Sequence, residues 1–310
     1  MKRISTKQLA SGFLLVLGTC AGGLAHADTT YTYTYGYQWN VSSSCANGSW
    51  NTSCGLNGGQ TSSSASPSGA PTDPNAPAAS LSASATGWAN TQGNSSTLAN
   101  QTLEQGKVQA WTSSSSGTSR TGMGVRNLDY SNTANGGESR LDGSEGSSPE
   151  HAVDNNERYD SILYAFDQSV SLTGVSLSWY SGDSDVSVLA YTGDTSVPSF
   201  DITTKLSDLR YDQLAANGWS FIGHYNGGYD KAINTSASSS YWLIGAANPL
   251  VGGSVDGAND YIKIASLAGT ITTQYTKHDT PSPPPGVPEP GSLALLGLGS
   301  LLLVRARAKS

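Results

Sequence analysis

The chain has 310 residues, of which 36% are hydrophobic and 8% aromatic, and its net charge is −7. That length supports one compact core with long loops rather than two independent cores. The acidity argues against nucleic acid as a partner, because an acidic surface repels the phosphate backbone.

Residues 1–27 have the pattern of a secretory signal peptide. Basic residues precede an apolar stretch, and a run of small residues ends at Ala27. Cleavage by signal peptidase between Ala27 and Asp28 would release the following chain outside the cytoplasm. The alternative is lipidation at Cys20, although Thr19 is a poor match to the residue that precedes a lipoprotein cysteine.

Residues 31–39 place an aromatic side chain at every second position, in the order Tyr-Thr-Tyr-Thr-Tyr-Gly-Tyr-Gln-Trp. Successive side chains of a strand point to opposite faces, so one face of this strand is wholly aromatic. That face is either a platform on which sugar rings stack or the first strand covering the core. We favour the core strand.

Two cysteines remain after the signal peptide, Cys45 and Cys54. Two thiols in an exported chain predict one disulfide bond. A metal or redox pair is the alternative, but the spacing is that of neither a zinc knuckle nor a thioredoxin motif.

Residues 56–100 are dominated by Ser, Ala, Gly, Pro, Thr and Asn. A segment with so little apolar surface cannot offset the entropy lost on ordering, so we expect a disordered, low-complexity insertion there.

The chain after this insertion predicts an all-β fold. Short segments rich in β-branched and aromatic residues predict strands at 108–112, 159–166, 174–180, 185–191, 241–246, 261–267 and 270–275. Residues 241–244 are continuously apolar, as in a central strand covered on both faces. Helical spacing over 206–214 ends at Asn217-Gly218. We therefore expect a single antiparallel β-sandwich, of jelly-roll or Ig-like type, over residues 28–276 with one short helix.

Acidic side chains gather between the expected strands and suggest a cation site. Asp154, Asp183 and Asp185 are candidate calcium ligands, because calcium prefers oxygen donors, and Asp256 and Asp260 form a further pair. Solvated loops are the alternative. Calcium is thus the one cofactor that the sequence suggests.

Motifs of known enzyme classes, such as G-x-S-x-G, H-E-x-x-H or a P-loop, are absent from the sequence. We therefore expect a non-enzymatic protein and assign no catalytic residue. A glycoside hydrolase is the alternative, since it needs only two acids facing each other in a cleft, such as Asp160 with Asp183 or Asp183 with Asp185.

A proline-rich spacer at 277–287 leads to a distinctive C-terminal segment at 288–310. Pro288-Glu289-Pro290 is followed by an apolar run and by a basic cluster that includes Arg305 and Arg307. The run is about a dozen residues, short for a membrane-crossing helix of ~20 residues, but flanking Gly and Ser can extend it.

This segment resembles the PEP-CTERM sorting signal of Gram-negative bacteria. The resemblance implies that an exosortase recognises the Pro-Glu-Pro, cuts there and passes the protein to the outer surface, often in strains that build exopolysaccharide. Until that cut, a C-terminal transmembrane sorting helix would hold the chain in the membrane. The alternative is an ordinary membrane anchor.

Residues 120–275 are similar to a second family, the first type of exosortase-dependent surface protein. The similarity rests on the segments 148–155, 159–160, 178–179, 182–193 and 240–244. It implies a secreted body without established activity and adds no catalytic residue. We therefore expect an exported surface or matrix protein, associated with biofilm or exopolysaccharide, with a secreted carbohydrate-binding module as the alternative.

Overall fold

A computed structural model describes residues 28–42, 45, 50–92, 100–115, 118–127, 152–156 and 158–278. Contacts divide the chain into a large unit, Tyr31–Tyr275, and a small one made of Met1–Thr30 and Thr276–Ser310. In the small unit, the Thr30 and Thr276 hydroxyls lie 2.9 Å apart, and Asp28 Oδ2 lies 2.8 Å from His278 Nδ1.

Thirteen strands among the described residues form one hydrogen-bonded sheet. They are β1 (Thr29–Val41), β2 (Cys54–Ser66), β3 (Ser80–Gln92), β4 (Thr102–Gln105), β5 (Lys107–Ser115), β6 (Thr118–Arg126), β7 (Val153–Asp154), β8 (Asp160–Gly182), β9 (Val186–Tyr191), β10 (Trp219–Tyr225), β11 (Asp230–Ala232), β12 (Ser239–Ala246) and β13 (Asp260–Lys277). Their pairings are antiparallel, which confirms the predicted all-β class.

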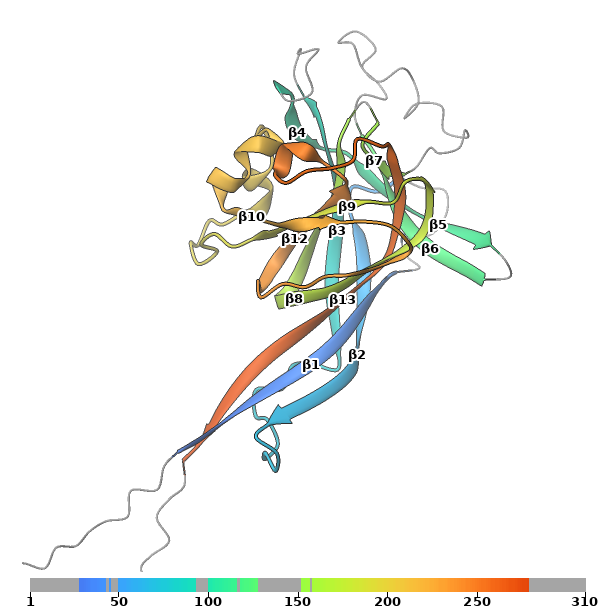
Figure 1. The fold of residues 1–310 in the computed structure, drawn as a ribbon. Helices are drawn as coiled ribbons and strands as arrows, with labels where there is room; N and C mark the ends of the chain where they lie inside the picture. The colour runs from blue at the N-terminus through green and yellow to red at the C-terminus, as the bar shows by residue number, and fades with distance from the viewer. Residues whose placement is uncertain are drawn as a thin grey trace, which may run out of the picture. The chain divides into compact units, whose positions relative to one another are not determined.

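The long strand β8 belongs to two parts of the sheet (Figure 1). Its first half pairs with β3 and β12, and its second half pairs with β11 and β13. The path from β8 through β3, β2, β1 and β13 returns to β8. One folded sheet therefore builds the layers that the sequence led us to expect from the two separate sheets of a jelly-roll or Ig-like sandwich.

The sheet around β12 is covered on both faces, as residues 241–244 predicted. Trp242 and Ile244 join a large apolar cluster that also receives the aromatic side chains of β1. Leu243 points the other way, into a smaller cluster with Leu206, Tyr211 and other residues. Because alternate side chains of a strand point to opposite faces, a strand buried on both needs a continuous apolar run.

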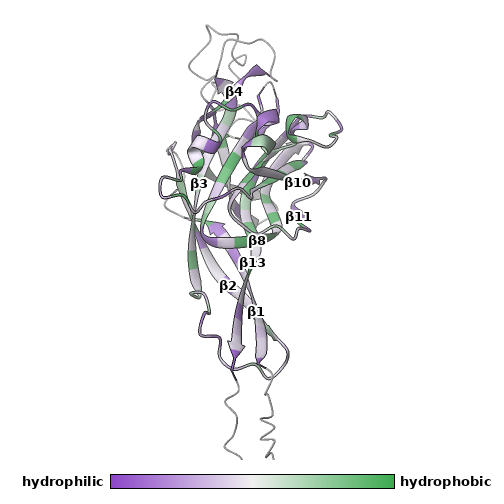
Figure 2. Cartoon of the chain, turned by 90° about the vertical axis from the view of Figure 1, so that its left-hand side faces the viewer, coloured by the Kyte–Doolittle hydropathy of each residue, from purple (hydrophilic) through white to green (hydrophobic). Residues whose placement is uncertain are grey.

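The aromatic face of β1 belongs to the core. Tyr33, Tyr35, Tyr37 and Trp39 are all buried, which confirms the core reading and removes the exposed platform. Figure 2 colours β1 and β2 mostly pale because tyrosine and serine are not scored as strongly apolar. Burial here follows from side-chain size rather than from hydropathy.

The disordered insertion expected over residues 56–100 is wrong for most of its length. Residues of this segment form the strands β2 and β3, each of 13 residues. β2 pairs with β1, and Gly58 lies opposite Trp39. A Cβ on Gly58 would collide with the Trp39 indole, so the small residues of β2 leave room for the large ones of β1. The loop between β2 and β3 is tied down as well, since the Tyr33, Tyr35 and Tyr37 hydroxyls donate to Pro71 O, Asp73 Oδ2 and Ala78 O.

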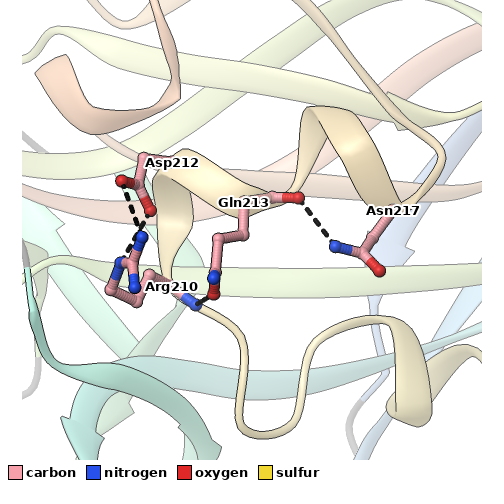
Figure 3. Close-up of polar contacts among 4 residues, drawn as sticks. All are labelled: Arg210, Asp212, Gln213 and Asn217. Carbon is pink, nitrogen blue, oxygen red and sulfur yellow. Dashed lines mark hydrogen bonds and ion pairs between the residues drawn. The ribbon is translucent and has the colours of Figure 1, made fainter.

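Three short 3-10 turns replace the single helix expected over 206–214. They are η5 (Ile202–Lys205), η6 (Tyr211–Gln213) and η7 (Ala215–Asn217), and η8 (Pro249–Val251) lies further along the chain. Figure 3 shows how η6 is closed: Arg210 N donates to Gln213 Oε1, and the Arg210 guanidinium pairs with Asp212. Gly218 ends η7 at φ 96°, a backbone conformation that favours glycine, as Asn217-Gly218 predicted.

The predicted disulfide bond is present between Cys45 and Cys54, whose Cα atoms are 5.5 Å apart. The signal peptide, the proline-rich spacer from residue 279 and the sorting segment lie outside the described residues. Among the residues that are described, no helix is both long enough and apolar enough to span a membrane.

Candidate functional site

Three aspartates from two separate parts of the chain meet at one end of β8, β9 and β13. One carboxylate oxygen each of Asp183, Asp185 and Asp260 can be chosen so that all three lie within 4.8 Å of one another. Asp183 and Asp185 stand in the turn between β8 and β9, and Asp260 begins β13. A bridge between Asp183 and Asp260 draws the two segments together.

Backbone and side-chain donors hold these carboxylates in place. Asp185 N donates to Asp260 Oδ1 over 2.7 Å, and Asn155 Nδ2 donates to Asp260 Oδ2 over 2.9 Å. Gly227 N donates to Asp185 Oδ1, and Ser184 N donates to Asp183 Oδ1. The cluster is therefore a built feature, whose acids accept specific hydrogen bonds.

A lysine supplies positive charge beside the cluster. Lys231 Nζ donates to Ser184 Oγ over 3.3 Å, to Gly228 O over 2.7 Å and to Gly227 O. Burial lowers the pKa of Lys231, whereas the charge of Asp185 and its neighbours raises it. The ammonium of Lys231 thus acts on the three carboxyl groups through its charge, while its hydrogen bonds go to Ser184, Gly227 and Gly228.

The negative charge that Lys231 does not balance affects the pKa of Asp260, which is fully buried. Burial raises the pKa of Asp260 to about 7; the hydrogen bond from Asp185 N opposes this, and the charges of Asp185, Asp183 and Asp256 add to it. Near neutral pH the cluster therefore exchanges a proton. Carboxylate oxygens in this arrangement are also the donors that calcium prefers.

The structure unites only part of the predicted ligand set. Asp183 and Asp185 lie together, but Asp154 is not in the group; its Oδ1 accepts from Asn156 N in a local turn. Asp260 replaces it, although the sequence reading had paired Asp260 with Asp256. That pairing follows chain order, whereas β13 carries Asp260 to the turn after β8.

A second feature lies on the face where the hairpin β5–β6 meets β8 and β13. Lys263 Nζ lies 5.7 Å from the ring centroid of Trp111 and 5.3 Å from that of Trp179. Trp179 and Lys263 are cross-strand partners, and a Cβ on Gly122 would collide with Ser178 Oγ. Glycine at 122 therefore lets the hairpin approach closely.

Next to these residues is a groove of about 460 Å³, which we call the polar groove. Its lining includes Gln38, Asn40, Arg120, Thr121, Ser176 and Asp230. At this groove, Gln38 Nε2 donates to Ser266 Oγ over 3.4 Å. The sequence reading singled out none of these residues, because no two of the contributing strands β1, β6, β8 and β11 are neighbours in the sequence.

Most residues that we predicted to govern processing lie in segments that the structure does not describe. Pro288, Glu289, Pro290, Arg305, Arg307 and Ala27 lie outside the described residues. Asp28, the expected first residue after signal cleavage, is described and contacts His278.

A comparison with protein-family models addresses the tail directly. The model of the PEP-CTERM protein-sorting motif matches residues 286–309. The chain carries a PEP-CTERM protein-sorting motif. The matched range includes the Pro-Glu-Pro and the terminal arginines, so the motif indicates export, exosortase processing and sorting to the cell surface.

The PEP-CTERM match covers the tail and not the body. No curated protein and no solved structure matches this chain. The similarity of residues 120–275 to the first type of exosortase-dependent surface protein therefore stays a prediction. What the body does has to be argued from its own side chains.

Proposed function

We propose that this PEP-CTERM protein is a non-enzymatic component of the cell surface or extracellular matrix, associated with exopolysaccharide. The single observation that carries the proposal is the sorting motif at residues 286–309. An exosortase would cut at Pro288-Glu289-Pro290 and leave the acidic body outside the cell. Without its two terminal signals, the chain has 10 Lys and Arg residues against 22 Asp and Glu residues. Such a charge keeps a protein soluble.

The contacts of the acidic residues support a non-enzymatic role. A glycosidase places two carboxyl groups roughly 5 to 10 Å apart on either side of a sugar. Asp185 and Asp260 are buried, and they lie within 4.8 Å of each other's oxygens. Asp160 is buried as well and accepts from Asn127 Nδ2. None of these three is placed to reach a sugar from solvent.

The Ser187–His224 pair has the chemistry of a nucleophile and base but the surroundings of a structural contact. Ser187 Oγ lies 3.0 Å from His224 Nδ1 and accepts from Asn248 N. His224 Nε2 lies 2.7 Å from Gly252 O, a contact that assigns the ring proton to Nε2. Ser187 is buried, so a substrate has no access to its oxygen.

The proposal is tested in a host that has the matching exosortase. Wild type, Glu289→Ala and the control Ser282→Ala are expressed, and the intact mass and cell fraction of each are measured. Ser282 lies in the same proline-rich segment but outside the matched motif. We expect wild type and Ser282→Ala to be shortened near Pro288 and recovered from the surface or matrix. Glu289→Ala should stay full length in the inner membrane.

Association with polysaccharide has its own readout in the same host. In a strain unable to make exopolysaccharide, processed protein should move from the matrix fraction to the medium. If its distribution is the same in both strains, the matrix role is wrong even when sorting proceeds normally.

A further inference from the structure

Exposed aromatic side chains gather on one face of the body. Among the described residues, the large apolar side chains that are exposed are Trp111 (42%), Tyr229 (41%) and Val197. The first two each carry a cation over the ring: Lys263 Nζ near Trp111, and the Arg120 guanidinium carbon 5.5 Å from the centroid of Tyr229. Such pairs are attractive because the ring face is negative.

Strand pairing places both aromatics beside the polar groove. Trp111 pairs with Gly122, the residue after the groove-lining Thr121 on β6. Lys263 lies two residues before Ala265, which lines the groove on β13, and Tyr229 directly precedes the groove-lining Asp230. Trp111 and Tyr229 therefore each lie next to a residue that lines the polar groove, although neither ring belongs to the lining itself.

The described surroundings of Lys263 lack a hydrogen-bond acceptor that an anion could supply. Its side chain is only 7% exposed, and its Nζ faces two tryptophan rings but, among the described residues, no oxygen acceptor. The nitrogen itself is not among the buried unpartnered atoms of the described part of the chain, so an anion from solvent can reach it and would supply the acceptor that this mostly buried side chain lacks. Burial lowers the pKa of Lys263 to about 8, so the group still carries its proton most of the time at neutral pH.

The lining of the groove matches a hydroxylated ligand. Gln38 and Asn40 present amides, Thr121 and Ser176 present hydroxyls, and Arg120 and Asp230 supply a donor and an acceptor of opposite charge. Flat aromatic faces beside such groups pack well against the apolar face of a sugar ring. Acids farther away than ~8 Å contribute little repulsion at physiological salt, and Asp230 is the one acid among the described residues that line the groove.

We propose that this face binds an acidic polysaccharide, with a sugar carboxylate on Lys263, that sugar's ring on Trp111, and the following sugars in the polar groove toward Tyr229. The proposal rests on the proposed function, because it names the class of matrix polymer that the body binds. It assigns recognition to Trp111, Lys263 and Arg120.

The test uses the processed protein purified from the exosortase host. Binding to polygalacturonate is measured by calorimetry and by retention on immobilised polymer, with fully methyl-esterified polygalacturonate as the uncharged counterpart. Dextran sulfate reports binding to any polyanion. Trp111→Ala removes the exposed ring, and Lys263→Met removes the charge while keeping most of the apolar stem. Arg210→Gln is the matched charge control, since Arg210 pairs with Asp212 away from the groove. Thermal unfolding checks that each variant is folded.

We expect polygalacturonate to bind wild type and Arg210→Gln equally, and Trp111→Ala and Lys263→Met each about tenfold more weakly, a loss of about 1.4 kcal/mol. If Lys263→Met fails to fold, Trp111→Ala and the esterified polymer still decide. Equal binding of the esterified polymer, or equal binding of dextran sulfate, overturns the carboxylate assignment. Unchanged binding by Trp111→Ala overturns the location of the site.

Failure of this inference is distinguishable from failure of the proposed function. A protein that binds none of these polymers but still partitions with the exopolysaccharide of its host has a matrix role with another ligand chemistry. If the amount of processed protein in the matrix fraction is the same with and without exopolysaccharide, the proposed function itself is wrong.

Discussion

Replacing Asp260 by asparagine should change how stability depends on pH. In the unfolded chain an aspartate has a pKa near 3.9, whereas burial, together with the neighbouring aspartates, raises the pKa of folded Asp260 to about 7. Between these values the folded protein binds a proton that the unfolded chain does not. The free energy of unfolding therefore falls as pH rises from about 4 to about 7.

The size of this effect has an upper limit set by the shift itself. A shift of about three units, at 1.36 kcal/mol per unit, corresponds to about 4 kcal/mol. The cluster can relax around Lys231, so we expect the part of this cost that falls between pH 5 and pH 8 to be about 1–3 kcal/mol. The side chain of the Asp260→Asn variant cannot titrate, yet its oxygen can still accept from Asp185 N. The absolute stability of the variant is a separate matter, because the new amide would face the amide of Asn155.

The assay is urea unfolding, followed by tryptophan fluorescence, at several pH values between 5 and 8 in the presence of EDTA, so that the proton is the only cation to enter the cluster. Asp256→Asn is the matched control, since Asp256 is an exposed acid whose charge acts on Asp260. Groups remote from the cluster titrate alike in all three proteins and cancel in the difference. Asp256→Asn removes one of the smaller causes that raise the pKa of Asp260, so its profile should stay close to that of wild type. We expect a smaller loss of stability with rising pH in Asp260→Asn than in the other two. Parallel profiles for wild type and Asp260→Asn would refute the reasoning.

Three further predictions concern calcium and the packing of β1. If calcium occupies the aspartate cluster, it should raise the unfolding midpoint more at pH 8 than at pH 6, where a proton competes with it; equal shifts would place calcium elsewhere. Gly58→Ala should destabilise by about 1–3 kcal/mol through collision with Trp39, whereas Gly59→Ala, which meets nothing within 4 Å, should change denaturant stability by under about 0.5 kcal/mol. Asp73→Ala should cost about 1–3 kcal/mol in the same assay, because it leaves the buried Tyr35 hydroxyl without its acceptor; a loss that small solvent-exposed substitutions also produce would argue against that network.

The strands that the sequence predicted are those that carry their own large apolar residues. The alternation of β1 and the continuous run of β12 each indicate a strand and the faces that it buries. β2 and β3 carry few such residues, namely Leu56, Leu81 and Trp88, and the apolar cluster that buries Leu56 and Leu81 is filled by the aromatic face of β1. Gly58 fits only because Trp39 lies opposite, and that fact depends on register, which a single sequence does not contain.

Polar or small residues within an apolar pattern led us to predict two strands where the structure has one long strand, in β8 and in β13. The polar residues 167–169 indicate a loop between two strands, yet β8 continues through them while they are exposed to solvent. The strand changes partners at this point, from β3 and β12 to β11 and β13. β13 likewise runs through Ala268 and Gly269, with its register shifted between them. Loop-like composition here marks a change of partner, not the end of a strand.

The candidate sites differ in how far apart their residues lie. The sorting motif is one contiguous segment at residues 286–309, so the sequence alone identifies it. The aspartate turn at 183–185 is contiguous too, but its third acid comes from β13, and the polar groove joins Gln38 to Ser266 across 228 positions. Such sites exist only after β1, β8 and β13 have paired. The cellular destination of this protein can therefore be predicted from its sequence, whereas its ligand has to be inferred from the side chains that the folded sheet brings together.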